Sequence, residues 1–247
     1  MLKQEIRQCA LSLGFSHFGI ARAAFLETDL HYLHQAAENG YFAGCHYLYR
    51  NPEQRCNPQL LMENTQSVLV FLHPYPILNS PNSNSKIAKF ALAEDYHQLI
   101  RKKLKQISTL LPQSSSKICV DTSPILEKVW AVRAGLGWIG KHKILLNENG
   151  SYFNIGLILS DLEFEYDTPK ESLCGNCNLC VESCPNQALN NGFLDCNLCI
   201  SYQTIESKSP NPELRYENYI YGCDICQDVC PYNATFKINH SLARSFK

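Results

Sequence analysis

Nine of the thirteen cysteines in this chain of 247 residues lie in one segment near its C-terminal end. The first residues, MLKQEIRQCALSLGF, mix charges with apolar positions and do not read as a secretory signal. Cytosolic thiols are kept reduced, so a disulfide framework is disfavoured and the crowding of thiols indicates metal. The nine cysteines are Cys174, Cys177, Cys180, Cys184, Cys196, Cys199, Cys223, Cys226 and Cys230.

The spacing of these cysteines indicates the kind of metal site. The pattern C-x2-C-x2-C-x3-C-P, from Cys174 to Pro185, is that of bacterial ferredoxins, where three thiolates bind one iron–sulfur cluster and the fourth binds its neighbour. A second run, C-x2-C-x3-C-P from Cys223 to Pro231, lacks the middle cysteine. One ligand must therefore come from elsewhere, and Cys196 or Cys199 can supply it.

Two 4Fe–4S clusters account for eight of the nine cysteines. Structural zinc is the alternative, since pairs spaced C-x2-C also form zinc ribbons, but zinc sites seldom repeat the whole series. Iron–sulfur clusters transfer single electrons, so we predict that electrons enter the protein through this segment. The first cluster takes Cys174, Cys177, Cys180 and Cys230, and the second takes Cys184, Cys223, Cys226 and either Cys196 or Cys199.

Charge and hydropathy exclude two broad classes of protein. The 22 basic and 23 acidic residues give a net charge of −1, which argues against a protein that works by covering nucleic acid with positive charge. The longest apolar run, near residues 68–72, is far shorter than the roughly 20 residues of a membrane-spanning helix. We therefore expect a cytoplasmic protein with no membrane partner.

Strands and helices alternate over the first two thirds of the chain. The pattern predicts an α+β fold, with a layered α/β domain over residues 1–165 and a ferredoxin-like domain with two clusters over residues 166–247. We expect Asp29 to cap the second helix. The expected helices span residues 2–13, 29–39, 94–111 and 125–134, and the expected strands 15–21, 67–73, 117–120 and 152–160.

The segment DTSPILEKVWAVRAGLGWIGKHKILL is the second informative feature of the sequence. Ser123-Pro124 is a typical cap and first-turn pair of a helix, which places Asp121 at the end of a strand, where a carboxylate faces a site. The alternative is that Asp121 itself caps the helix. The glycines of GLGWIG follow this helix and do not open one, so they give little support to a nicotinamide site.

The chain resembles the epoxyqueuosine reductases, cobalamin-dependent iron–sulfur enzymes of tRNA modification. The segments that carry the resemblance are DTSPILEKVWAVRAGLGWIGK, CGNCNLCVESCPNQAL, CISYQTIE and YGCDICQDVCPYN, with looser agreement in GFSHFGIARA, RNPEQRCNP and EDYHQLIRKKL. They extend over essentially the whole chain. In that family the cysteine of the CISY motif is a cluster ligand, which selects Cys199 over Cys196.

The resemblance implies a reaction and the residues that perform it. Epoxyqueuosine, at the wobble position of a tRNA, loses its epoxide oxygen with two electrons and protons, and Asp121 is the implied general acid. That role requires a pKa raised by burial beside the corrin. Cobalamin is expected between the two domains, and its implied contacts are Asp121, Leu145, Gly156 and Leu159, with Arg50 or Arg55 at its polar periphery.

The resemblance also implies partners. Contacts to tRNA are expected from the segment CISYQTIE and from one basic helix face, for which a merely solvated face is the alternative. An external electron donor of the flavodoxin or ferredoxin type is expected, and the protein is expected to be a monomer. The basic residues of that face are Arg101, Lys102, Lys103 and Lys105.

Three features depart from the family pattern. His142 follows GK where asparagine is usual, and it could be a neutral exchange beside the corrin or another proton donor. The stretch KFALAE also differs, and the chain ends soon after the second cluster motif, which indicates a short form or a truncation. The competing hypotheses are a cobalamin-dependent reductive dehalogenase acting on a small molecule and a ferredoxin-like electron carrier.

Overall fold

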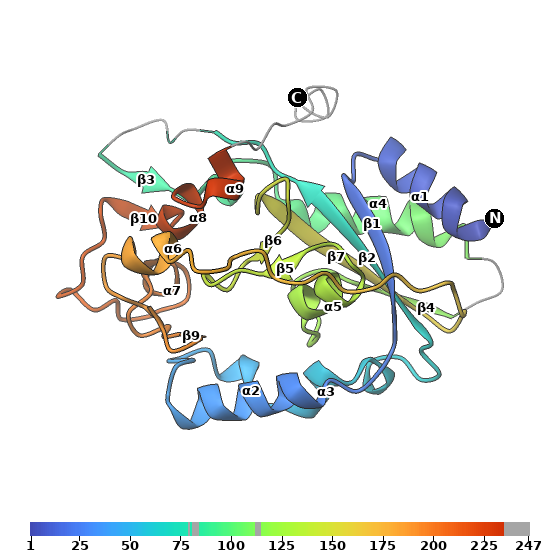
Figure 1. The fold of residues 1–247 in the computed structure, drawn as a ribbon, viewed down its shortest axis with the longest axis horizontal. Coiled ribbons are helices and arrows are strands. Elements are labelled where there is room, and N and C mark those ends of the chain that lie inside the picture. The colour runs from blue at the N-terminus through green and yellow to red at the C-terminus, as the bar shows by residue number, and fades with distance from the viewer. Residues whose placement is uncertain (79, 81–83, 112–114, 235–247) are drawn as a thin grey trace.

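A four-stranded sheet forms the centre of the first part of the molecule (Figure 1). The computed structural model describes residues 1–78, 80, 84–111 and 115–234. The strands are β1 (His17–Arg22), β2 (Ser67–Pro74), β7 (Phe153–Ser160) and β4 (Ser116–Cys119), in the spatial order β1-β2-β7-β4. Every neighbouring pair is antiparallel, as expected of an α+β fold.

Both faces of the sheet are buried, because successive side chains of a strand point to opposite faces. On β2, Val68, Val70 and Leu72 face one apolar cluster, whereas Leu69 and Phe71 face the other. The first cluster is covered by α2 (Glu27–Glu38), α3 (Pro52–Cys56) and α5 (Glu127–Arg133), and the second by α1 (Leu2–Ser12) and α4 (Tyr96–Ser108). The sheet is therefore a middle layer between helices.

The cysteine-rich part is built from much shorter elements. It follows an extended connection that runs along the molecule as a gold trace in Figure 1 and is partly or fully exposed over residues 161–173. Its elements are α6 (Leu179–Glu182), β8 (Leu189–Asn190), β9 (Phe193–Leu194), α7 (Ile200–Ile205), β10 (Tyr219–Tyr221), α8 (Ile225–Asp228) and α9 (Pro231–Ala234).

The two parts share a strand pair and several polar contacts. Strand β10 pairs in parallel with β3 (Lys86–Ile87), which belongs to the first part of the sequence. Beside this pair, the Lys89 ammonium lies 2.6 Å from an Asp228 carboxylate oxygen. Further along, the Ser151 amide donates to Asn233 at 2.7 Å. A predicted boundary near residue 165 therefore separates two stretches of sequence that remain in close contact.

The remaining elements are short and connect the layers. The residues between α5 and β7 form a small hairpin, and three 3₁₀ turns lie in the loops of the first part. Among the described residues, no helix is both long and apolar enough to cross a membrane. These elements are β5 (Trp138–Ile139), β6 (Leu145–Leu146), η1 (His46–Leu48), η2 (Pro58–Leu60) and η3 (Lys89–Ala91).

The long elements occur where the sequence predicts them, but two predicted caps are wrong. Helix α2 begins at Glu27, so Asp29 lies in its first turn and Leu26 is the N-cap. Helix α5 begins at Glu127, after Leu126, so neither Ser123 nor Asp121 caps it. The polar stretch NSPNSNS, at residues 79–85, is predicted from its composition to be a loop, and it lies partly outside the described residues.

Candidate active site and iron–sulfur ligands

Asp121 lies on an open loop directly after β4. Its backbone φ of +57° is in the left-handed region, which is uncommon for a residue other than glycine. The Asp121 amide donates to Glu127 Oε1 at 2.6 Å, and this bond ties the loop to the first residue of α5. Because the Asp121 side chain is 53% exposed, its carboxylate is free to face a ligand.

His97, in the first turn of α4, connects Asp121 to a second carboxylate. Its Nε2 lies 3.1 Å from Asp121 Oδ2, and its Nδ1 lies 2.7 Å from Asp95 Oδ1. Asp95 is also the N-cap of α4, because its side chain accepts the His97 amide. Burial lowers the pKa of His97, but the hydrogen bonds with Asp95 and then Asp121 outweigh burial and raise the net value.

Burial and the charge of Asp121 raise the pKa values of two neighbouring groups, Glu127 and Tyr96. Burial first, and then the charge of Asp121, raise the pKa of Glu127 to about 7 against the opposing hydrogen bond from the Asp121 amide. Burial first, and then the charge of Asp121, also raise the pKa of the Tyr96 hydroxyl. Titratable groups whose pKa values are shifted by burial and a charged neighbour are typical of functional sites.

Tyr47 connects this site to the cysteine-rich part. The charge of Asp121 is among the causes that raise the pKa of Tyr47, after burial and Cys45. The Tyr47 hydroxyl lies 3.5 Å from a carboxylate oxygen of Glu206, just after α7. Asp121 therefore lies in the region where the sheet domain meets the CISYQTIE segment.

The two predicted arginines differ in their surroundings. Arg55 donates through Nε and Nη2 to the Tyr47 carbonyl at 3.0 and 2.8 Å, so it braces the loop that carries Tyr47. Arg50 is exposed on the same stretch. Arg55 therefore holds the loop that carries Tyr47.

The other predicted cobalamin contacts lie in the protein interior. Leu145 of β6 is 3% exposed, and Leu159 of β7 is 0% exposed. A Cβ added to Gly156 would lie 2.6 Å from Ile100 Cγ2, so this glycine allows α4 to approach the sheet closely. Contact with cobalamin at Leu145, Gly156 or Leu159 would have to be made through the backbone, and these three contacts stay predictions.

The predicted cluster ligands form two neighbourhoods. Burial, and then the nearby Cys174 and Cys230, raise the pKa of the Cys180 thiol. Burial raises the pKa of the Cys230 thiol, and Cys174 and Cys177 also contribute to this increase. In the second group, burial and then Cys223 and Cys199 raise the pKa of Cys226, and Cys184 acts on Cys199. All eight cysteines are free thiols, so each group of four offers the donor set of a 4Fe–4S cluster.

Cys196 has a different neighbour. The hydrogen bond with Cys45, ahead of burial, raises the pKa of Cys196. The Cys196 amide also donates to the Tyr41 carbonyl at 2.8 Å. Cys196 therefore belongs to the contact between the two parts, whereas Cys199 lies among the other cysteines of the second group.

Unpartnered polar atoms gather in the segment that follows the Asp121 loop. Among the described residues, the buried side-chain atoms with no hydrogen-bond partner include Trp130 Nε1, Trp138 Nε1 and His142 Nε2. His142 is 3% exposed, and burial, then Lys128, lower its pKa to about 4, which makes its imidazole neutral. The amide oxygens at the periphery of cobalamin would supply acceptors for such donors, so the chemistry of this segment fits that cofactor.

Only part of the basic face predicted on α4 is exposed to solvent. Lys102 and Lys105 are exposed and Arg101 is half-buried. Lys103 is 9% exposed, and its ammonium lies 2.6 Å from Nε2 of the buried His73. The prediction that Lys103 lies on an exposed basic face that contacts tRNA is therefore wrong, because the helical spacing turns Lys103 toward the sheet.

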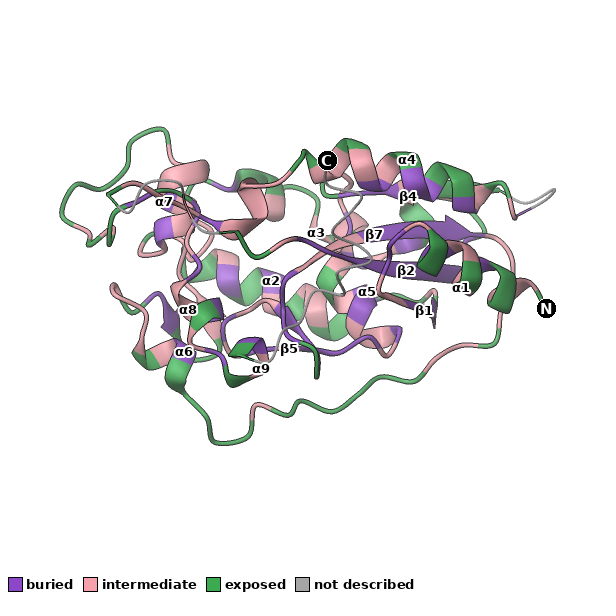
Figure 2. Cartoon of the chain, turned by 90° about the horizontal axis from the view of Figure 1, so that it is seen from above, coloured by how far each residue is buried: buried purple, intermediate pink, exposed green. Residues whose placement is uncertain are grey.

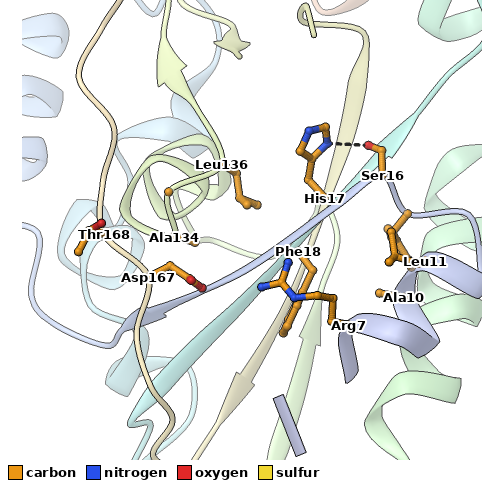
Figure 3. Close-up of a pocket in the computed structure, with 12 residues that line it drawn as sticks. Arg7, Ala10, Leu11, Ser16, His17, Phe18, Ala134, Leu136, Asp167 and Thr168 are labelled. Carbon is orange, nitrogen blue, oxygen red and sulfur yellow. Dashed lines mark hydrogen bonds between the residues drawn. The ribbon is translucent and has the colours of Figure 1, made fainter. Parts of the chain in front are cut away.

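Two cavities lie away from Asp121. Figure 3 shows one of about 330 Å³ between α1, β1 and the end of α5, where the Arg7 guanidinium lies 5.4 Å from the centre of the Phe18 ring. Another, of about 430 Å³, is lined by Lys86, Arg215 and Cys184. Of the predicted site residues, only Cys184 lines either cavity, so neither of them is the site around Asp121.

Comparison with known proteins identifies the family. Residues 173–233 match the model of a 4Fe-4S double cluster binding domain, and residues 55–122 match Epoxyqueuosine reductase QueG, DUF1730. The chain is 40% identical to the epoxyqueuosine reductase of Cyclobacterium marinum over 243 residues, which cover 93% of this chain and 78% of the relative. The chain belongs to the epoxyqueuosine reductase family.

Solved structures agree with this assignment. The chain superposes on an epoxyqueuosine reductase crystallised with an epoxyqueuosine-modified tRNA-Tyr stem loop, with a TM-score of 0.89 and 30% identity over 96% of this chain and 67% of that protein. The reductive dehalogenase NpRdhA gives a TM-score of 0.65 at 15% identity, over 98% of this chain and 33% of that protein. At that identity the dehalogenase likeness shows a shared fold alone.

The sequence pointed to Asp121 and the cysteines but not to the groups around Asp121. His97, Asp95 and Tyr96 lie in the segment EDYH, which agrees with the family only loosely when read as a sequence. An aspartate two residues before a histidine, at the start of a helix, is a weak signal on its own. Only the fold brings this segment to the end of β4.

Proposed function

We propose that this chain removes the epoxide oxygen of epoxyqueuosine at the wobble position of tRNA, which yields queuosine. The observation that carries the proposal is the position of Asp121, an open carboxylate in the region where the sheet domain meets the cysteine-rich part, in a chain of the epoxyqueuosine reductase family. The related structure with a modified tRNA stem loop supports the same class of substrate.

The reaction requires two electrons and two protons for each epoxide. Two carbon–oxygen bonds break, a carbon–carbon double bond forms, and the oxygen leaves as water. Negative charge develops on the oxygen as the ring opens, so a proton donor at that atom lowers the barrier. Asp121 is the proposed donor. Its side chain is 53% exposed where the two parts of the chain meet, so the burial that this role requires would come from bound cobalamin and tRNA.

The chain's own residues would hold the cofactors. The first cluster would be bound by Cys174, Cys177, Cys180 and Cys230, and the second by Cys184, Cys199, Cys223 and Cys226. Cobalamin would lie in the layered α/β domain between Asp121 and the cysteine-rich part, near Arg55 and the segment with unpartnered donors. Bound cobalamin supplies the electron-rich centre that cleaves the carbon–oxygen bond.

Further partners follow from this activity. An external one-electron donor of the flavodoxin or ferredoxin type would reduce the clusters, and a monomer in the cytoplasm would meet the tRNA. The exposed residues Lys102 and Lys105, with the half-buried Arg101, would contact phosphates, and α7 would face the anticodon loop.

The direct test is turnover of tRNA that contains epoxyqueuosine. The protein is reconstituted anaerobically with iron, sulfide and cobalamin, and nucleosides are examined by mass spectrometry after addition of a strong reductant. Loss of one oxygen supports the proposal. Bound cofactors with unchanged tRNA would show that the reductase acts on another substrate.

Asp121→Asn tests whether Asp121 is the general acid and should leave the binding of both cofactors unchanged. The variant keeps the size of the side chain but has no carboxylic proton, so we expect turnover to fall by about 100-fold or more while iron and cobalamin contents stay at wild-type levels. Near-normal turnover by this variant would assign the general acid to another residue.

A further inference from the structure

A proton donor that works repeatedly needs a source from which it regains its proton. In each turnover Asp121 would give a proton to the opening epoxide and would be left as a carboxylate. The bound tRNA would restrict the access of water to this carboxylate during the reaction. A group that touches Asp121 and also reaches solvent could return the proton.

His97 contacts the Asp121 carboxylate and is itself partly open to solvent. Its Nε2 contacts Asp121 Oδ2 at 3.1 Å, and its other ring nitrogen contacts Asp95 Oδ1 at 2.7 Å. The His97 side chain is 38% exposed, so one part of the ring remains open to water. This arrangement gives each ring nitrogen a carboxylate partner, which favours the doubly protonated ring.

The other titratable neighbours of Asp121 are less suited to return the proton. Glu127 contacts the backbone amide of Asp121 and accepts that bond, so it positions the loop. The pKa of the Tyr96 hydroxyl is raised by burial, by Asp121 and by Glu127, so this group keeps its proton at neutral pH. His97 remains, with Asp95, Asp121, Glu127 and Tyr96 as the titratable groups that act on this site.

We propose that His97 returns a proton to Asp121 after each turnover and that Asp95 orients His97 for this transfer. The inference rests on the proposed function, with Asp121 as the general acid. The imidazolium gives its Nε2 proton to Asp121 Oδ2. It keeps its Nδ1 proton, which stays hydrogen-bonded to Asp95 Oδ1. Nε2 is then the ring nitrogen without a proton, and it takes one from solvent after the product tRNA leaves, so the proton count is balanced in each cycle.

The first test compares pH profiles of turnover. In the wild-type protein, turnover falls as pH rises through the raised pKa of His97, because the imidazolium form is lost. His97→Gln keeps a polar side chain that does not titrate in this range, so we expect turnover about 10- to 100-fold lower at pH 7 and no such decline with pH. His34→Gln is the matched control, since His34 is exposed on α2.

Chemical rescue distinguishes proton return from structural support. His97→Ala leaves space at the ring position, and added imidazole should restore a large part of its turnover without improving Asp121→Asn. Asp95→Asn should lower turnover by a smaller factor, about 3- to 10-fold, because it loses the charge that favours the imidazolium.

A measurement without turnover tests the same contacts. In the cluster-loaded chain labelled at histidine, the NMR signal that is missing in His97→Gln should titrate above pH 6.5, the value of a free histidine. Asp95→Asn and Asp121→Asn should each lower that pH. Titration of His97 at or below pH 6.5 would contradict the proposal.

The outcomes separate the two levels of inference. No turnover of epoxyqueuosine-containing tRNA by the wild-type protein would refute the proposed function and proton return with it. Turnover by the wild-type protein together with an unchanged pH profile in His97→Gln would refute proton return alone.

Discussion

The sheet domain and the cysteine-rich part are held together in different ways. All eight residues of β2 are buried, and apolar clusters fill both faces of the sheet. In the cysteine-rich part, the helices contain four to six residues and the strands two or three. Helices of that length are not stable by themselves, so the fold of this part must depend on other bonds.

Figure 2 shows the same contrast in burial. The strands β2 and β7 are buried along most of their length, whereas the segments around α6, α7 and α8 are mostly intermediate or exposed. Metal ligation can replace apolar burial as the source of folding free energy. The sheet domain should therefore tolerate the loss of the clusters, and the cysteine-rich part should not.

The largest expected effect is that of removing iron. Chelation should abolish the protection of amides against hydrogen exchange across residues 174–233, while β2 and β7 stay protected because apolar packing holds them. Hydrogen exchange measured by mass spectrometry checks this. Retained protection in the cysteine-rich part would show that it folds without its metal.

A matched pair of cysteine variants sharpens this prediction. Cys199→Ser should lose about half of the bound iron, because one of two clusters loses a ligand, whereas Cys196→Ser should keep it. Iron and sulfide analysis reports both. The reverse result would make Cys196 the ligand.

The next effect concerns pH and the sheet domain. Burial, then Lys103, lower the pKa of His73 to about 3, from the 6.5 of a free histidine. Below pH 6.5 the unfolded chain takes up a proton that folded His73 does not, so this residue's contribution to stability falls by about 1.4 kcal/mol per pH unit until about pH 3. His73→Gln keeps an acceptor for Lys103 and should reduce this slope in urea unfolding between pH 6.5 and 5. An unchanged slope would show that His73 is protonated in the fold.

A smaller effect is expected from Gly156→Ala. The added methyl group would meet Ile100 and Leu104 of α4, and overpacking of this kind costs about 1–3 kcal/mol of unfolding free energy. Cobalamin content should not change. In combination with Ile100→Ala, the loss should be less than the sum of the two single variants. Lower cobalamin affinity with unchanged stability would support Gly156 as a cofactor contact.

The smallest expected effect is on tRNA affinity, and it tests which part of the chain contacts tRNA. Exchanging Lys102 and Lys105 for glutamate should weaken tRNA affinity roughly 3- to 10-fold in moderate salt and reduce its dependence on salt concentration. The charge-preserving arginine variants serve as controls, and filter binding over a salt series measures both. Unchanged affinity would leave α7 and the cysteine-rich part as the contact.

The sequence predicted elements that local patterns determine. The apolar run at residues 67–73 became β2, and the amphipathic pattern at residues 2–13 became α1. Caps were less predictable: the structure starts α5 at Glu127, four residues after Ser123, because the chain between them forms turns. Lys103 was read as a surface residue, since the sequence does not show that His73 lies opposite it.

The candidate site divides in the same way. Regular cysteine spacing and the DTSP motif indicated iron–sulfur ligands and a catalytic carboxylate, because these signals are local in sequence. His97 contacts Asp95, which lies two positions before it, and Asp121, which lies 24 positions after it. The contact between His97 and Asp121 depends on where α4 packs against the sheet, which no local pattern specifies.

By itself, the amino-acid sequence determined which chemistry this protein can support, since thiol spacing and a helix period are properties of neighbouring residues. The tertiary structure decided which groups meet: Cys196 with Cys45, Lys103 with His73, and His97 with Asp121. The reason is physical, because such contacts depend on the packing of whole layers, and that packing is set by the summed burial of residues far apart in the chain.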